Sequence, residues 1–531
     1  MTQPARPTVP ERERAFTGFL LWNHPEIALA AGILAGILAA LTLGFIPFGN
    51  GTELGSAGGC RPQKSLTLVE VVGNSMLPTL NGGTVYETCP KCGMHGPRVS
   101  QGASVCPNCG WIVSERERDS LAYQNQSQQE IRFEDLLATR PRRAYAIDDV
   151  VVVRPNSAQG LVIKRVAGVP GDHLEVRDGM LFRNGRRSVR PLEVWNQMRI
   201  PVYLDDFRPD GVSRWLASGS GAQPLADGWR FGTNHAVCLK YAHQTGRLLP
   251  DRSGNVVCRM EPAPITNLRA ENGTQYRADS VALISELLCE FTLDRGCAQK
   301  TESARLLLSL PTNDGEFLFA LVPEKSDLAS VKEEILREVA SGTLESMAGG
   351  TFEAGIYAIP RASSKSEPSE SPSCRVTAST LDGLPRLLWN GKPLASAQTF
   401  SLTEAASEAA SEAAAEPVKL HENQESPGRF DYVSTVRIWS RGDESVEIRH
   451  LALFRGEYWE NFLRNFHYFA QNTKKTLAFD CNCGYYLVGD NFFVSDDSRQ
   501  WGTVSGEQIL GKVILPRRRF ENEAPKVGQN H

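Results

Sequence analysis

The chain has 531 residues, of which 41% are apolar and 22% are charged, and its formal net charge is −4. This length predicts several domains, and the near balance of 57 basic and 61 acidic residues argues against a polyanion-binding protein, so we expect no nucleic-acid partner. Twelve cysteines are too few for a disulfide scaffold, and a mean hydropathy of −0.28 excludes a polytopic membrane protein. A single membrane helix stays compatible with these values.

One apolar run near the N-terminus is long enough to cross a membrane. It ends at Pro47 and carries no charge from residue 27 onward, and about 20 residues at 1.5 Å each span the ~30 Å hydrocarbon core. The alternatives are a core helix, which would show a polar face, and a cleaved signal peptide, whose apolar region is shorter. We expect a cytoplasmic tail at 1–26, in line with its arginines, and a transmembrane helix at 27–47.

Ser75 is the first candidate for catalysis. The alternating stretch 65–72 predicts a strand, and it runs directly into GNSMLPTL at 73–80. A serine at a sharp bend after a strand is how an exposed nucleophile is usually held. An ordinary turn would show the same short pattern.

Lys164 lies inside a second apolar strand, LVIKRVAGVPGD at 161–172, which follows another predicted strand at 148–153. Burying an ammonium group is costly, and burial lowers the pKa of a lysine, as a general base at neutral pH requires. The alternative is a lysine that reaches solvent at an edge or pairs with a carboxylate. Arg165 should point to the opposite face and stay solvated.

A polar loop, GDNFFVSDDSR at 489–499, follows the predicted strand 484–488. It could supply a hydroxyl group to the lysine and an aspartate–arginine pair to brace the site. Taken alone, it could equally be a surface turn.

The three motifs, in this order after a membrane helix, resemble three boxes of the type I signal peptidases. These are membrane-anchored serine–lysine endopeptidases that remove signal peptides from exported proteins. The resemblance implies that Ser75 is the nucleophile, Lys164 the general base, and Ser495 the serine that orients the lysine. It also implies that Asp497 and Arg499 form a bracing pair.

Three positions depart from the family pattern. Phe492 stands where the family usually has arginine, Asp148 stands where it has glycine, and Gly73 stands where some members have a serine that joins the oxyanion hole. The hole would then use the backbone N–H of Ser75 and a second donor. Such a donor is worth about 10²–10³ in rate, so we expect a replacement.

The resemblance also implies the substrates and the location. The substrates would be signal peptides of secretory preproteins, with small residues at −1 and −3, bound as an extended strand. Signal peptides are cut on the exported side, so everything after residue 47 should be extracytoplasmic. The protein would cross the inner (cytoplasmic) membrane once, in contact with membrane lipid.

Two CPxCG motifs lie between the serine and lysine strands, with cysteines at Cys89, Cys92, Cys106 and Cys109. Two such knuckles complete a tetrahedral site of four thiolates, and the pair resembles a zinc ribbon. We expect a structural Zn²⁺ and no catalytic cofactor, because four thiolates leave no open position. Two disulfides are the alternative in an oxidising compartment.

The interval between the lysine strand and the 489–499 loop is far longer than a connection needs. Short strands with Gly, Asn and Pro turns between them predict a β-sandwich there, jelly-roll-like and able to bind an unknown ligand. The predicted strands are 285–294, 304–310, 316–322, 374–380, 384–394, 432–440 and 445–459, with one amphipathic helix at 331–339. Two low-complexity stretches, 363–373 and 404–417, are expected to be linkers.

We therefore expect a mainly β protein whose signal-peptidase-type catalytic core is written in pieces around two insertions. The expected boundaries are 65–88, 112–188 and 471–520 for the core, 89–111 for the zinc ribbon, 189–470 for the β-rich insertion and 521–531 for a C-terminal tail.

The leading functional hypothesis is an active membrane-anchored signal peptidase. One alternative is a catalytically idle membrane-anchored scaffold whose β-sandwich binds a protein or glycan partner. A self-cleaving regulator of the same serine–lysine clan is a third. The presence of both Ser75 and Lys164 favours the enzyme, because an idle scaffold has no use for a buried lysine.

Overall fold

The computed structural model describes residues 66–82, 86–97, 103–114, 123–124, 130–135, 144–155, 160–177, 180–218, 221–232, 237–272, 283–293, 305–344, 351–360, 373–403, 436–441, 445–457 and 477–515. The expected membrane helix at 27–47 and the two tails lie outside these residues, as does nearly all of both linkers. Among the described helices, none is long and apolar enough to cross a membrane.

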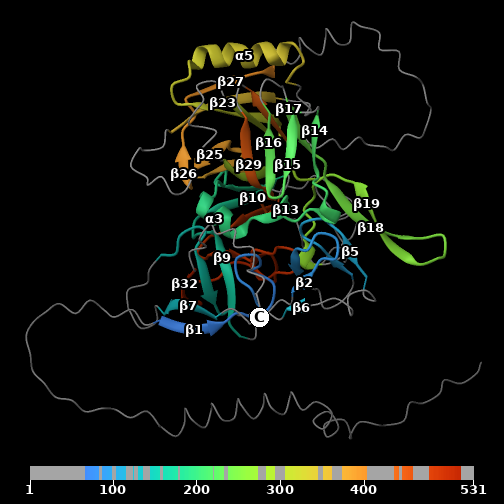
Figure 1. Ribbon diagram of the computed structural model, residues 1–531. Helices are drawn as coiled ribbons and strands as arrows, with labels where there is room; N and C mark the ends of the chain where they lie inside the picture. The colour runs from blue at the N-terminus through green and yellow to red at the C-terminus, as the bar shows by residue number, and fades with distance from the viewer. Residues whose placement is uncertain are drawn as a thin grey trace, which may run out of the picture. The chain divides into compact units, whose positions relative to one another are not determined.

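The first sheet gathers strands from distant parts of the sequence, and every neighbouring pair in it is antiparallel. Figure 1 shows β32 (Ile509–Ile514) beside β7 (Glu130–Asp135), near β9 (Val162–Gly168), the strand that carries Lys164. The order is β1 (Leu66–Glu70), β7 (Glu130–Asp135), β32 (Ile509–Ile514), β8 (Val150–Val153), β9 (Val162–Gly168) and β31 (Tyr486–Val488).

Both faces of this sheet are covered, which explains the run of four valines in β8. Val150 and Val152 pack with Met76 on one face, and Val151 and Val153 belong to a separate cluster on the other. All four valines are at most 2% exposed. A strand that is buried on both faces reads as a continuous apolar run rather than as an alternation.

A smaller sheet joins the chain before and after the large insertion. Asn184 and Gly185 both have positive φ and form the tight turn between β11 and β12, as the Asn-Gly pair predicts. The order is β12 (Arg186–Arg187), β11 (Met180–Arg183), β10 (His173–Arg177) and β30 (Leu477–Asp480).

Two large sheets form the insertion. The first has the order β15 (Ala222–Leu225), β16 (Gly228–Phe231), β29 (Val446–Arg455), β20 (Leu287–Leu293), β24 (Cys374–Ser379), β25 (Arg386–Trp389) and β26 (Lys392–Leu394), and β13 (Ile200–Leu204) also pairs with β29. The second has the order β14 (Trp215–Ser218), β17 (Val237–Tyr241), β28 (Arg437–Arg441), β21 (Arg305–Pro311), β22 (Gly315–Pro323), β23 (Thr351–Ile359) and β27 (Gln398–Ser401).

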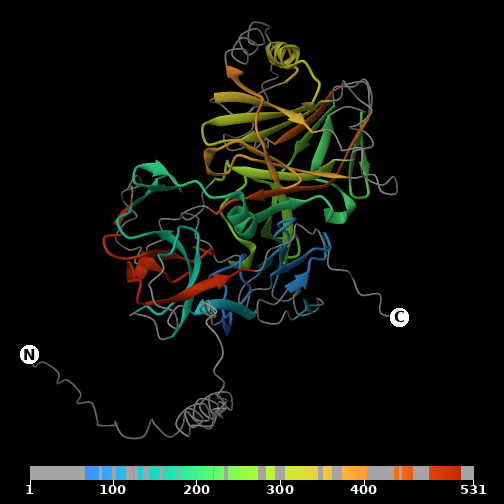
Figure 2. The same cartoon turned by 90° about the vertical axis from the view of Figure 1, so that its left-hand side faces the viewer.

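One hydrophobic core lies between these two sheets. Phe231 and Phe291 of the first sheet belong to the same buried cluster as Trp215 and Phe319 of the second. The sheets therefore pack face to face, and their green-to-orange strands form a body of their own in Figure 2. Trp389 is also buried in this core.

The second sheet contains one parallel pair, β22 with β23, which departs from an all-antiparallel jelly roll. The helix α5 (Leu328–Ala340) makes the crossover between these strands, where 331–339 predicts a helix. Asp327 caps its first turn by accepting from the Ala329 N–H at 3.2 Å. Other short helices are α3 (Leu192–Met198), α7 (Ser498–Trp501), η1 (Pro209–Gly211), η2 (Ala270–Asn272) and η4 (Leu381–Gly383).

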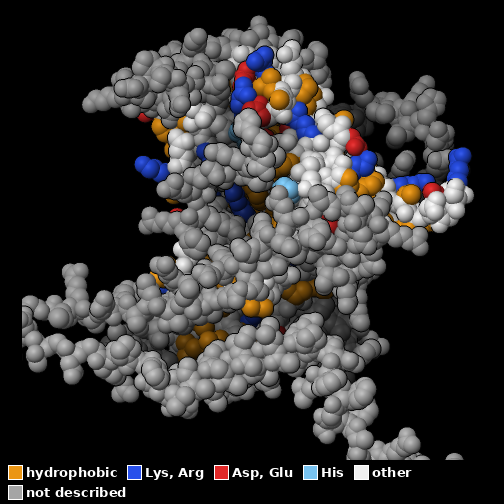
Figure 3. All heavy atoms as spheres, turned by 60° about the horizontal axis from the view of Figure 1, so that its bottom comes forward, with side chains coloured by type: hydrophobic (Ala, Val, Ile, Leu, Met, Phe, Trp, Pro, Cys, Tyr) orange, Lys and Arg blue, Asp and Glu red, His pale blue; other side chains and the backbone are white. Residues whose placement is uncertain are grey.

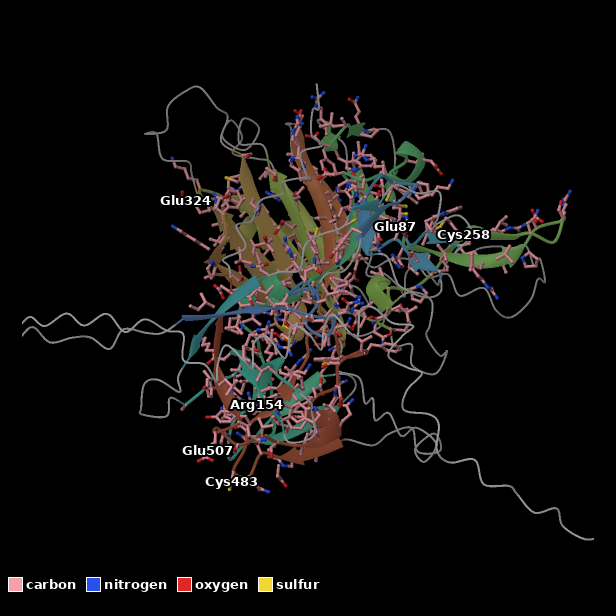
Figure 4. The ribbon with its side chains drawn as sticks, turned by 90° about the horizontal axis from the view of Figure 1, so that it is seen from below. Glu87, Arg154, Cys258, Glu324, Cys483 and Glu507 are labelled. Atoms are coloured by element: carbon pink, nitrogen blue, oxygen red, sulfur yellow. The ribbon has the colours of Figure 1, made fainter. Side chains whose placement is uncertain are left out.

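Two small sheets flank the cysteine motifs. One has the order β3 (His95–Pro97), β2 (Tyr86–Thr88) and β6 (Tyr123–Gln124), and the other pairs β4 (Ser104–Val105) with β5 (Ile112–Val113). A hairpin of the insertion, β18 (Gln244–Pro250) with β19 (Val256–Pro262), packs against them. The Ile112 N–H donates to Cys258 Sγ at 3.3 Å, and the Gly246 N–H donates to the Gly110 carbonyl at 2.9 Å. Figure 4 marks Cys258 on this hairpin.

Charge on the described surface is mixed in sign. On the face drawn in Figure 3, Lys and Arg side chains lie among Asp and Glu side chains. Among the described side chains drawn there, both signs of charge are present, in agreement with the near balance of basic and acidic residues in the sequence.

Candidate active site

The serine segment, residues 71–80, presents Ser75 at a bend whose neighbours are anchored in the core. Met76 and Leu80 are at most 2% exposed and pack under the first sheet. The Leu80 N–H donates to the Met76 carbonyl at 2.9 Å, which closes one helical turn directly after the serine. The anchors leave Ser75 itself half-buried.

Lys164 and Ser75 lie together although they are 89 residues apart in the sequence. Lys164 Nζ is 3.2 Å from Ser75 Oγ, and Lys164 is only 3% exposed. Burial lowers the pKa of Lys164, and the nearby carboxylates of Asp497 and Asp496 oppose that shift. The geometry therefore places a weakly basic amine within hydrogen-bonding distance of a hydroxyl group.

The expectation that Arg165 stays solvated is wrong. Arg165 is 1% exposed, and its Nε and Nη2 each lie 2.7 Å from a carboxylate oxygen of Asp490. Its Nη1 donates to the Asp148 carbonyl at 2.9 Å, and Thr79 also bonds to the Asp490 carboxylate. The loop 489–499 covers the second face of β9, so both neighbouring side chains of that strand are buried.

Gly489 lies where the serine segment and the loop 489–499 approach most closely. A Cβ at this position would be 2.5 Å from the Ser75 carbonyl oxygen and 2.6 Å from Ser495 Cβ. A backbone hydrogen bond also joins the two segments: the Asn491 N–H donates to the Ser75 carbonyl at 2.9 Å. Only a glycine allows this approach, because real Cβ atoms essentially never come within 3.0 Å of such neighbours.

Asp497 and Arg499 form the ion pair that the loop pattern predicts, at 2.8 Å. Asp497 also caps α7 and accepts from the Gly489 N–H at 3.0 Å. Phe492, at the position where arginine is usual in the resembled family, is 1% exposed. The Arg499 guanidinium lies 5.3 Å from the centre of its ring, which lets the phenylalanine contribute to the packing of the turn.

Ser495 is 1% exposed and lies beside Gly489. Its hydroxyl has no hydrogen-bond partner within the described part of the chain, so the expected bond to Lys164 is not among the contacts seen there. A buried hydroxyl without a partner costs about 1–3 kcal/mol. Ser495 is thus at the site, with unused hydrogen-bonding capacity.

The four cysteines of the two CPxCG motifs form one cluster that could bind a metal. Their sulfur atoms all lie within 4.8 Å of one another. The Sγ atoms of Cys89 and Cys109 are 3.6 Å apart, as are those of Cys92 and Cys106. Disulfides need about 2.05 Å, whereas four sulfurs at ~2.3 Å from a common zinc would be separated by roughly 3.8 Å. The donor set and spacing therefore fit a tetrahedral thiolate site.

Residues outside the three motifs also contact the site. Within the motifs, the sequence patterns did not indicate that Asp490 and Arg165 would form an ion pair. Two further residues lie outside the motifs. Arg269 and Asn272, from the insertion, hydrogen-bond to the loop 489–499. No local signal marks these two residues, because they lie in a short polar stretch far from all three motifs.

Comparison with known proteins finds a similarity to one family of peptidases. The family model described as signal peptidase, peptidase S26, matches residues 109–217 and 458–517, a range that includes Lys164 and Ser495. Ser75 precedes the matched residues, and most of the insertion separates the two matched segments. No curated protein matches the chain. Over these two segments, which most of the large insertion separates, the chain is therefore similar to the signal peptidase S26 family.

Proposed function

We propose that this protein is a membrane-anchored serine endopeptidase that removes signal peptides from exported preproteins, with Ser75 as nucleophile and Lys164 as general base. The supporting observation is the 3.2 Å distance between Lys164 Nζ and Ser75 Oγ, with the lysine 3% exposed. Burying a lysine costs folding free energy. A catalytically idle scaffold would gain nothing from that cost.

The reaction would be acyl transfer to the serine. Neutral Lys164 accepts the Ser75 hydroxyl proton while Ser75 Oγ attacks the scissile carbonyl carbon. The lysine then gives this proton to the leaving amine nitrogen, and the mature chain departs. A water molecule gives a proton to Lys164 while its oxygen attacks the carbonyl carbon of the acyl-enzyme. As the bond from that carbon to Ser75 Oγ breaks, Lys164 returns the proton to Ser75 Oγ, which releases the signal peptide with a new carboxylate and restores the free enzyme. We assign Ser495 to holding the lysine amine towards Ser75, because its buried hydroxyl has capacity for that bond.

The surroundings of the serine suit an apolar, extended substrate. Val72 is 74% exposed and lies three residues before the serine, between β1 and the bend. Val494, next to Ser495, is 36% exposed. Since β1 is at the edge of the described sheet, an extended peptide can add to it by β-augmentation and place small −1 and −3 side chains near Ser75.

The anchor and the location complete the proposal. The apolar run at 27–47 would cross the inner membrane once and hold the catalytic domain on the exported side, against membrane lipid. The jelly-roll-like character of the insertion and its unknown ligand stay predictions. The four clustered cysteines would hold one structural Zn²⁺ that stabilises the ribbon.

Cleavage of a synthetic peptide with an Ala-x-Ala site tests the proposal. The purified full chain in detergent should cut it after the second alanine. Ser75→Ala and Lys164→Ala should each lower kcat/KM by at least about 10³, the size expected for losing a nucleophile or its base. Full activity in either variant would contradict the assignment of that residue.

A further inference from the structure

Arg269 belongs to the insertion, yet its side chain lies between the serine segment (residues 71–80) and the loop 489–499, which are called the two catalytic loops below. It is 2% exposed and lies just before η2. One nitrogen, Nη2, donates to the Leu77 carbonyl at 2.9 Å. The other, Nη1, donates to the Asp490 carbonyl at 2.8 Å. A single guanidinium group therefore ties the serine segment to the loop 489–499.

The charge of this guanidinium is compensated within the insertion. Glu457, which follows β29, accepts from Arg269 Nη1 at 3.0 Å, and its side chain is 6% exposed. Arg455 donates to the carbonyls of Asn267 and Leu268, at 3.0 and 2.7 Å, and so fixes the backbone directly before Arg269. Because both ends of the contact are held, the guanidinium is presented to the catalytic loops in a fixed position.

A second contact runs parallel to the first. The side-chain amides of Asn272 and Asn491 donate to each other at 3.3 and 3.1 Å. The backbone N–H of Asn491 in turn donates to the Ser75 carbonyl at 2.9 Å. The segment 269–272 of the insertion therefore reaches Ser75 by two routes. Asn272 is connected to it through Asn491, and Arg269 is connected to it through Leu77, which follows Ser75 by two positions in the chain.

The rigid fork of an arginine sets the separation of the two groups that it bonds. Leu77 follows Ser75 by two residues, and Asp490 precedes Ser495 within the loop that contributes Asp497 beside Lys164. Fixing the two carbonyls relative to each other therefore fixes the serine relative to the surroundings of its base. Displacements of about 1 Å cost up to 10²-fold in rate at such sites.

We propose that Arg269 is a positioning residue for the Ser75–Lys164 pair, and that the insertion completes the active site through it. This inference rests on the peptidase function proposed above. It gives the inserted sheets a task in the reaction itself, in addition to any ligand that they bind.

The test compares Arg269→Gln with wild type in the full chain, on the Ala-x-Ala peptide, across pH. A matched control is Arg214→Gln. Arg214 is also buried, at 5% exposed, and also donates to two backbone carbonyls, those of Gln244 and Cys109. Its side-chain hydrogen bonds in the described part of the chain go to these two carbonyls and not to the serine segment or the loop 489–499. Both substitutions remove a buried arginine from the insertion, so both should lower thermal stability.

The pH dependence of kcat separates positioning from stability. The charged groups around Lys164 are Asp497, Asp496, Arg499 and Asp490. All four lie in the loop 489–499, which Arg269 holds at the Asp490 carbonyl. Loosening the loop admits water to the lysine, so the rising limb of the profile should move to higher pH in Arg269→Gln. We expect kcat to fall at least tenfold with KM changed less than threefold. Arg214→Gln should keep the wild-type midpoint.

The outcomes are distinct. If wild type does not cleave the peptide, the proposed function fails, and this inference fails with it. If wild type cleaves but Arg269→Gln shows a reduced amplitude with an unmoved midpoint, Arg269 has only a structural role and the inference is overturned. Should Arg269→Gln not fold, Asn272→Ala decides, since it removes the parallel contact and should move the midpoint in the same direction by a smaller amount.

Discussion

Substituting Gly489 tests how closely the serine segment and the loop 489–499 are packed. In Gly489→Ala, the new Cβ would lie 2.5 Å from the Ser75 carbonyl oxygen and 2.6 Å from Ser495 Cβ, where 3.0 Å is the practical minimum. Both groups must therefore retreat by about half an ångström, at a cost of about 1–3 kcal/mol for overpacking. Because a 1 Å misplacement costs up to about 10²-fold, we expect kcat/KM to fall roughly tenfold or more.

The assay is cleavage of the Ala-x-Ala peptide, with a thermal melt of the same samples. Gly506→Ala is the matched control, because its Cβ would meet only Tyr485, at an ordinary 3.6 Å. The control should match wild type in both measurements. Wild-type kcat/KM and melting temperature in Gly489→Ala would refute the idea that this contact sets the geometry of the site.

Three further predictions concern the base, the buried ion pair and the ribbon. Because burial lowers the pKa of Lys164, the neutral base forms as the pH rises through that pKa, and kcat/KM should rise along one limb. Between the lowered pKa of the folded state and about 10.4, the unfolded state binds more protons than the folded state, so the free energy of unfolding should also rise with pH there. Denaturant titrations should show this rise in wild type and not in Lys164→Met. Asp490→Asn leaves the buried guanidinium of Arg165 without its carboxylate and should lower the unfolding free energy by about 3–5 kcal/mol, whereas an unchanged denaturation midpoint would show that the pair is not buried in solution. Elemental analysis should find one zinc per chain, lost in Cys109→Ser and retained in Cys483→Ser, since Cys483 is exposed and outside the cluster; a zinc-free wild type would contradict the metal site.

The parts of the site that are continuous in sequence were predictable, because each motif carries its own chemistry. The bends around Ser75 and the loop with Ser495 follow strands in the structure as their patterns indicate. The prediction for Arg165 was wrong because the alternation along β9 assigns Lys164 and Arg165 to opposite faces of the sheet. The alternation does not show whether other parts of the chain cover one face or both. That depends on the loop 489–499, which is 325 residues further along at Asp490.

Contacts from the insertion could not be predicted for a related reason. Arg269 is 192 residues from Leu77 and 221 from Asp490, and nothing in its local sequence marks it. Strands of the insertion with clean apolar runs, such as 316–322, are found as expected. Those between 215 and 262 have interruptions, such as Pro224 in β15 and Gly246 in β18, and their patterns did not predict strands.

The pairing of β13 with β29 has a consequence for how the chain folds during synthesis. Ile200, near the start of the insertion, pairs with Arg455, near its end. Once these strands pair, the chain before the insertion is tied to the chain after it. Bringing the core strands together then closes a loop that is effectively shorter by some 250 residues, at a lower entropic cost. The core strands β10 and β30, and likewise β8 and β32, can pair only after the later strand of each pair has been made. We therefore expect the insertion to fold first, and the peptidase to become competent only after β32 has been made.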